Sequence, residues 1–194
     1  MAKSDPSSSK KERMKNVKWV ITIFFVTILV SGLISMGSDA LMSVSGLAVA
    51  FLVLLVIILV GIVFDIIGVA VTSADEKPFH SMAARKVPGA QEAISLLRRA
   101  DRVGSVCNDV IGDICGVVSG SASATIAALV IANSQSVHPQ AISLLMSALV
   151  AGLTVGGKAL GKAFAIRSCT SIVHTVGRIV YGVKRLPRLF CRQK

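Results

Sequence analysis

Four long apolar stretches constrain the fold of this chain more than any other feature. They cover residues 17–36, 45–72, 103–132 and 140–157. A helix needs about 20 apolar residues to cross the hydrocarbon core of a bilayer. Helices also satisfy their own backbone hydrogen bonds in lipid. The sequence therefore predicts an all-α integral membrane protein with four transmembrane helices.

The basic residues are divided unevenly among the segments that connect these stretches. Six of the 21 Lys and Arg lie before or at the very start of the first stretch, the sixth being Lys18; six lie between the second and third, and nine lie at or beyond Lys158. Residues 37–44 and 133–139 contain none. The positive-inside rule then predicts a multi-pass protein of the cell membrane with both termini in the cytoplasm. The formal net charge of +11 is explained by orientation, without nucleic acid as a partner.

The remaining segments are too polar to span a membrane. Residues 1–16 are expected to be a disordered basic N-terminus, and residues 77–102 a cytoplasmic hairpin of two short helices divided at Pro88-Gly89. Residues 172–183 carry an apolar stripe beside basic side chains, which is typical of an amphipathic helix on the inner leaflet. This juxtamembrane helix predicts attraction to anionic inner-leaflet lipids, and residues 186–194 continue as a basic tail.

Oxygen-bearing side chains gather near one end of two of the apolar stretches. Asp109 and Asp113 lie on one helical face of the third, and Ser73 and Asp75 follow the end of the second. Carboxylates inside a membrane cost at least about 2.5–3.5 kcal/mol each, so they are expected to face protein or water. Oxygen ligands without thiolate or imidazole suit a hard cation such as Mg²⁺. The alternative is interhelical hydrogen bonding plus an Asp–Lys pair with Lys158, holding the bundle together.

The sequence predicts no enzyme. It contains no Ser/His/Asp arrangement, no phosphate-binding loop and no HExxH motif. The spacing of the four cysteines fits no zinc pattern.

Several stretches together follow the motifs of one known family of membrane proteins. Ser73-Ala74-Asp75-Glu76 resembles a family sequence at the end of its first helix, and residues 84–102 (ARKVPGAQEAISLLRRADR) resemble its cytoplasmic hairpin. Asn108 falls at the first Asn of a family motif in which Gly112 replaces the second, and residues 157–168 resemble the end of the last membrane helix. Over about residues 62–185, the chain thus resembles the membrane domain of the CNNM/CorC family of magnesium transport proteins.

The resemblance implies a homodimer with three spanning helices and a juxtamembrane helical belt in each protomer. It assigns residues 45–185 to this domain and makes residues 17–36 an extra helix. The implied cation ligands are Ser73, Asn108 and Gly112. Charge compensation would come from further residues, namely Asp75, Asp109, Asp113 and Lys158.

Two positions depart from the family pattern. Lys158 falls where the family has a functional Glu, and Gly161 where it has a helix-breaking Pro. A fixed ammonium opposes a bound cation by about 4 kcal/mol per pair of unit charges at 4 Å and an effective dielectric constant of 20. Two hypotheses follow: a protein that binds or moves a divalent cation, and a non-transporting membrane scaffold or partner subunit with the same fold.

Overall fold

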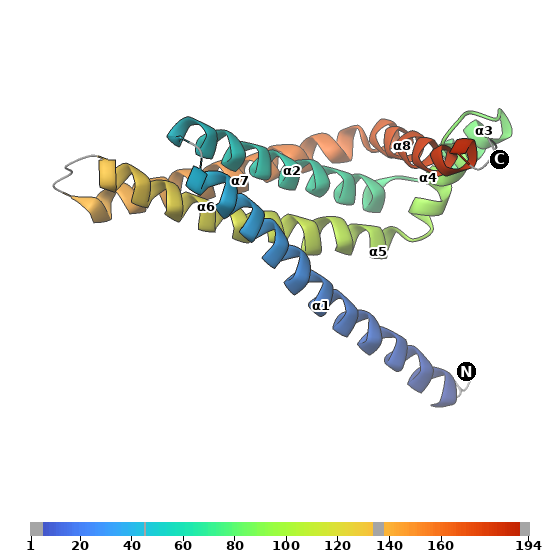
Figure 1. Ribbon diagram of the computed structural model, residues 1–194. Helices are drawn as coiled ribbons and strands as arrows, with labels where there is room; N and C mark the ends of the chain where they lie inside the picture. The colour runs from blue at the N-terminus through green and yellow to red at the C-terminus, as the bar shows by residue number, and fades with distance from the viewer. Residues whose placement is uncertain (1–5, 45, 134–137, 191–194) are drawn as a thin grey trace.

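The computed structural model describes residues 6–44, 46–133 and 138–190, and all regular structure within these ranges is helical. Figure 1 shows long helices with a group of shorter ones at one end. The helices, in chain order, are α1 (Pro6–Val44), α2 (Leu47–Ser73), α3 (Lys77–Ala84), α4 (Ala90–Leu97), α5 (Ala100–Ser105), the π-helix η1 (Val106–Ile111), α6 (Gly112–Asn133), α7 (Pro139–Arg167) and α8 (Cys169–Phe190).

Four helical segments in the described ranges are long and apolar enough to cross a membrane: Val17–Ser38, Leu47–Ser73, Ala100–Asn133 and Pro139–Arg167. The all-helical fold and the four apolar helices predicted from the sequence are thus confirmed. The last segment extends well beyond residue 157 as a continuous helix to Arg167. Lys158 and Lys162 do not interrupt it, because Lys is a good helix former and can reach polar groups with its long stem.

Helix α1 is longer than the apolar stretch that it contains. It begins at Pro6, although disorder was expected throughout residues 1–16; residues 1–5 lie outside the described ranges. Proline is well suited to a first helical turn, and the following KKERMK run consists of good helix formers, so the helix continues through the polar segment. Figure 1 shows α1 beside the bundle near its C-terminal end and diverging from it toward the N-terminus.

Helix α2 lies at the centre of the bundle and packs against both α6 and α7. One apolar cluster joins the three helices, with Leu54 and Ile58 from α2, Ile126 from α6 and Val150 from α7 all buried. Close packing of this kind drives helix association in lipid, where no hydrophobic difference separates protein from solvent.

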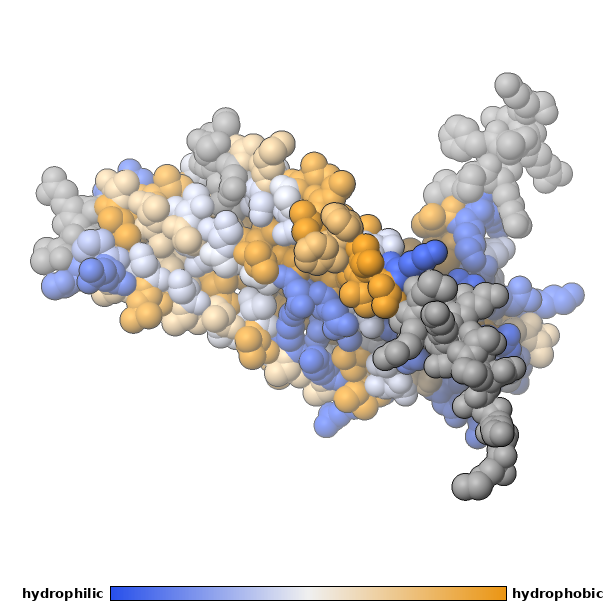
Figure 2. Space-filling view, turned by 90° about the horizontal axis from the view of Figure 1, so that it is seen from below, coloured by the Kyte–Doolittle hydropathy of each residue, from blue (hydrophilic) through white to orange (hydrophobic). Residues whose placement is uncertain are grey.

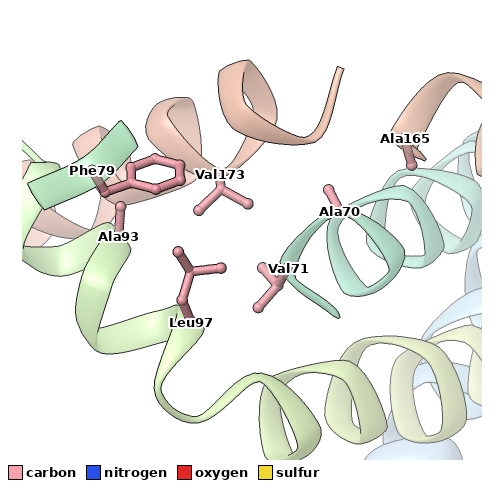
Figure 3. Close-up of a cluster of buried hydrophobic side chains, with 7 residues drawn as sticks. All are labelled: Ala70, Val71, Phe79, Ala93, Leu97, Ala165 and Val173. Atoms are coloured by element: carbon pink, nitrogen blue, oxygen red, sulfur yellow. The ribbon is translucent and has the colours of Figure 1, made fainter. Parts of the chain in front are cut away.

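A second cluster joins α2 to the short helices and α8. Its buried members are Ala70, Val71, Phe79, Ala93, Leu97, Ala165 and Val173. Figure 3 shows Val71, Phe79, Ala93, Leu97 and Val173 around a common space between α2, α3, α4 and α8, with Ala70 and then Ala165 of α7 to one side of it. Phe79 is completely buried. This cluster fixes the short helices and the start of α8 to one end of α2.

Two glycines allow α8 to approach the turn before α4 very closely. Gly89 has φ = 86°, in the left-handed region that favours glycine, and ends the turn after α3. A Cβ atom added at Gly177 would lie 2.5 Å from the Gly89 carbonyl oxygen and 3.1 Å from Ala93 Cβ. The backbone contact therefore depends on the absence of a side chain at Gly177.

The surface follows the same division as the helices. Figure 2 shows pale and orange residues over much of the bundle, with strongly hydrophilic residues at the end where α3 and α4 lie, at the opposite end and in one patch between them. The start of α1, the short helices and the end of α8 are all drawn toward that end in Figure 1. Side chains along the spanning helices are widely exposed, among them Leu52, Val117, Leu145 and Leu160. This arrangement is typical of a bundle whose outer surface faces lipid.

Candidate cation site

One face of α2 carries small or polar residues against η1 and α6. Gly61, Asp65, Gly68 and Thr72 follow helical spacing and so lie along one side of the helix. A Cβ atom at Gly61 would lie 2.9 Å from Cys115 Cβ, and one at Gly104 would lie 2.8 Å from Thr72 Cγ2. These contacts show that α2 lies very close to α6 at Gly61 and to α5 at Thr72.

Asn108 fills the space that the missing side chain of Gly68 leaves. A Cβ atom added at Gly68 would lie 2.7 Å from Asn108 Cγ and would overlap the amide oxygen Oδ1. This oxygen is buried and accepts no hydrogen bond within the described part of the chain. A buried acceptor without a donor costs about 1–3 kcal/mol, so Oδ1 is a strong candidate for a cation ligand or a water contact.

Asn108 stands on a π-helical turn. The backbone N–H of Gly112 donates to the carbonyl oxygen of Cys107, five residues earlier, at the end of η1. Such single π turns inside α-helices occur frequently at functional sites, because the extra residue turns side chains and carbonyls away from the regular ladder. The sequence predicted a plain helix over 103–132, since a π turn has no clear signature in hydrophobic periodicity.

Lys158 reaches from α7 to the same region. Its Nζ donates a hydrogen bond to the carbonyl oxygen of Gly112 at 3.4 Å. It also lies 3.4 Å from the position that a Cβ atom at Gly112 would take. The Lys158 stem is therefore directed into the bundle interior, and its ammonium occupies a place where a metal cation would meet a carbonyl oxygen.

Asp65 lies between Gly61 and Gly68 on the inner face of α2. It is 4% exposed, and its Oδ2 lies 4.0 Å from Lys162 Nζ, while no hydrogen bond reaches this oxygen from any described residue. Asp65 is about 4.5 Å along the helix axis from Gly68, the residue that contacts Asn108. It also lies about 12 Å from the end of α2 at Ser73. Asp65 is thus a deeply placed carboxylate on the face that Asn108 covers.

Asp65 was not among the site residues predicted from the sequence. The pattern Gly61-x₃-Asp65-x₂-Gly68 was available as a signal, because it places a carboxylate between two close-approach positions of one helical face.

The other predicted site residues lie apart from this face. Ser73 is exposed at the end of α2, about 140° around the helix axis from Gly68. Asp75 is also exposed, and its Oδ1 accepts the backbone N–H of Lys77 at 3.2 Å. Asp109 and Asp113 are exposed on η1 and α6. The structure therefore places the Gly112 carbonyl with Lys158 and Asn108 against Gly68, and turns Ser73 toward a different side.

Three oxygens on three elements, α2, η1 and α6, could serve a hard cation: Asp65 Oδ2, Asn108 Oδ1 and the Gly112 carbonyl. Amide, carbonyl and carboxylate oxygens are the ligands that Mg²⁺ prefers. Two ammonium groups, from Lys158 and Lys162, now supply the positive charge there. In the described ranges, no three His, Cys, Asp or Glu side chains form a group that could hold a metal ion.

The comparisons with known proteins identify no family. No model of a protein family, no curated protein and no solved structure matches the chain. The candidate site therefore has to be interpreted from its own residues.

Proposed function

We propose that this protein binds or moves a divalent cation, with Mg²⁺ as the expected substrate, at a site between α2 and η1. The buried, unpartnered Oδ1 of Asn108 on the π turn is the observation that carries the proposal. Asp65 supplies the negative charge from the inner face of α2, and the Gly112 carbonyl supplies a neutral oxygen. The resemblance to the CNNM/CorC membrane domain agrees with a role for Asn108, whereas Asp65 is added by the geometry.

The two lysines define how such a site would work. Lys158 and Lys162 act as tethered cations that neutralise the oxygens when no metal is bound. A Mg²⁺ ion entering from the end of the bundle near α3 and α4 would displace the Lys158 ammonium from the Gly112 carbonyl. Competition between ammonium and metal lowers the metal affinity, and weak binding favours release during transport.

A second candidate function is a membrane scaffold or partner subunit without transport. The Lys158–Gly112 hydrogen bond and the Lys162–Asp65 pair support it, because both satisfy interior oxygens permanently if the lysines never leave. In this case the polar groups hold the helices together and bind no metal.

We further propose a homodimer and an orientation with both termini in the cytoplasm. Support for the dimer comes from Gly116, Gly120, Gly152 and Gly156, since a Cβ atom at any of them would meet nothing within 4 Å. Beside them lies a cavity of about 200 Å³ between α6 and α7, into which the buried Ser123 faces with its hydroxyl unpaired among the described residues. These small-residue faces are free to receive helices of a second copy. Asp109 and Asp113 are exposed and lie on the same helical face as Gly116 and Gly120.

Calorimetric titration of the purified full-length protein with Mg²⁺ tests the proposal directly. Heat of binding is expected for the wild type and is expected to disappear in Asn108→Ala and Asp65→Asn, because each removes a ligand oxygen or its charge. Asp75→Asn, an exposed carboxylate outside the site, serves as the matched control. Absence of heat from every protein, together with a lower melting temperature of Asp65→Asn, would establish the scaffold.

Flux measurements in proteoliposomes then separate binding from transport. A Mg²⁺-sensitive dye inside the vesicles reports entry, with Na⁺ and other divalent cations tested in parallel. Binding without flux would restrict the function to cation binding.

A further inference from the structure

A groove lies between α2 and α8, on the side of α2 away from the candidate cation site. Its volume is about 440 Å³, within the range of roughly 300–1,000 Å³ that small-molecule sites occupy. The apolar lining comes from α2 and from the two helices that follow each other at Ser168: Val63, Ile66, Ile67, Phe164, Ile172 and Ile179. Exposed apolar area of this kind on a membrane protein suits a hydrocarbon chain.

One edge of the groove is a polar stripe along α8. Ser168, Ser171 and Thr175 line the groove, and Arg178 follows at the same helical spacing. Ser171, Thr175 and Arg178 are all exposed. The Thr175 hydroxyl donates to the Ser171 carbonyl oxygen at 2.9 Å, and its oxygen can still accept a hydrogen bond. The hydroxyls of this stripe match the ester region of a phospholipid whose acyl chain lies in the groove. The guanidinium at the end of the stripe matches the phosphate.

The positive charge of this part of the chain favours a lipid with an anionic headgroup. From Lys158 to Lys194 the sequence contains nine Lys and Arg and no Asp or Glu, the last acidic residue being Asp113. An α8 surface with this composition attracts anionic headgroups and repels none. Arg binds phosphate oxygens through paired N–H groups, which gives this contact more specificity than a point charge does.

We infer that the groove binds one anionic phospholipid, with an acyl chain along α2 and its phosphate at Arg178. The hydroxyls of Ser171 and Thr175 lie at the glycerol ester groups. The bound lipid fills the space between α2 and α8, and so connects α8 to the spanning bundle. This site is separate from the proposed cation site and does not depend on it.

Native mass spectrometry of the full-length protein in mild detergent tests the inference, because detergent removes the extended anionic surface and leaves only specific contacts. Phosphatidylglycerol and phosphatidylcholine are added in parallel. We expect one phosphatidylglycerol per protomer in preference to phosphatidylcholine. Arg178→Gln is expected to weaken phosphatidylglycerol binding by about tenfold, the effect of losing hydrogen bonds to a charged group. Lys184→Gln, an equal loss of charge elsewhere on α8, is expected to have no effect.

A groove-filling variant tests the acyl chain separately from the phosphate. Thr175→Trp places a large ring in the groove and is expected to abolish binding of both lipids, with Ser171→Trp as a second obstruction if the first fails to fold. Equal losses in Arg178→Gln and Lys184→Gln would overturn the inference, as would full binding to a folded Trp variant. A change in the mass of the assembly in Thr175→Trp, with lipid retained, would instead make the groove an interface between copies and also overturn it.

Discussion

Asn108 and Gly68 are in direct contact across the interface of η1 and α2, with the amide of Asn108 in the space where a side chain of residue 68 would lie. The position of the candidate ligand is therefore set by a glycine on a different helix. Any side chain at residue 68 has to displace the amide or separate the helices.

Replacement of Gly68 by Ala is expected to lower stability by about 1–3 kcal/mol, because the added methyl overlaps the Asn108 amide in a close-packed interface. Thermal unfolding in detergent measures this loss. Gly32→Ala is the control, since nothing lies within 4 Å of a Cβ there and alanine favours helix by up to about 1 kcal/mol. Equal melting temperatures for the two variants would contradict the close contact.

Gly177→Ala should detach α8 from the turn at Gly89. The new methyl would lie 2.5 Å from a backbone oxygen that cannot rotate away, so we expect a loss of about 1–3 kcal/mol. Gly182→Ala on the same helix has open space and is expected to be neutral or slightly stabilising. Limited proteolysis of α8 in both variants reports detachment. Protection of Gly177→Ala equal to that of Gly182→Ala would show that the packing is not tight.

Replacement of Lys158 by Met keeps the apolar stem and removes the charge that competes for the Gly112 carbonyl. If the site binds Mg²⁺, we expect at least about a tenfold gain in affinity, or about 1.4 kcal/mol. Lys158→Glu should strengthen binding further. Lys184→Met, an exposed residue on α8, controls for the loss of net charge. An unchanged Mg²⁺ affinity in Lys158→Met would show that the Lys158 ammonium does not compete with the metal.

Gly120→Leu is expected to weaken self-association, because the face around Gly120 is open within one protomer and a large side chain there would block a second copy. Mass photometry in native lipid particles measures the distribution of monomer and dimer. Gly32→Leu, at an equally open position on α1, serves as the control. A wild-type protein that is monomeric in native lipid would argue against the dimer itself.

Orientation can be tested by labelling single cysteines in a chain that lacks its four native ones. Substitutions at Ser43 and Gln135 are expected to react with an impermeant maleimide from outside intact cells, and those at Ser95 and Gln193 are expected not to react. Strong outside labelling at Ser95 would reverse the proposed topology.

The sequence alone determined the class of fold and the number of apolar helices. Runs of about 20 apolar residues leave few alternatives to spanning helices. The hydrophobic signal is local, and in lipid the backbone N–H and C=O groups must form their hydrogen bonds within the chain. The extent of α1 was less predictable, since the good helix formers before Val17 do not by themselves guarantee a helix: helical stability in proteins comes mostly from packing.

Only the tertiary structure decided which polar residues meet. Ser73 and Asn108 both lie near the ends of apolar stretches, yet the rotation of α2 turns Gly68 toward η1 and Ser73 away. The direction of Lys158 depends on the packing of α7 against α2, where Ile62 and Ile66 lie against Gly157 and Gly161. The rotation of each helix about its axis and the π turn at Asn108 arise from contacts between residues far apart in the chain. Hydrophobic periodicity within one segment cannot predict such contacts.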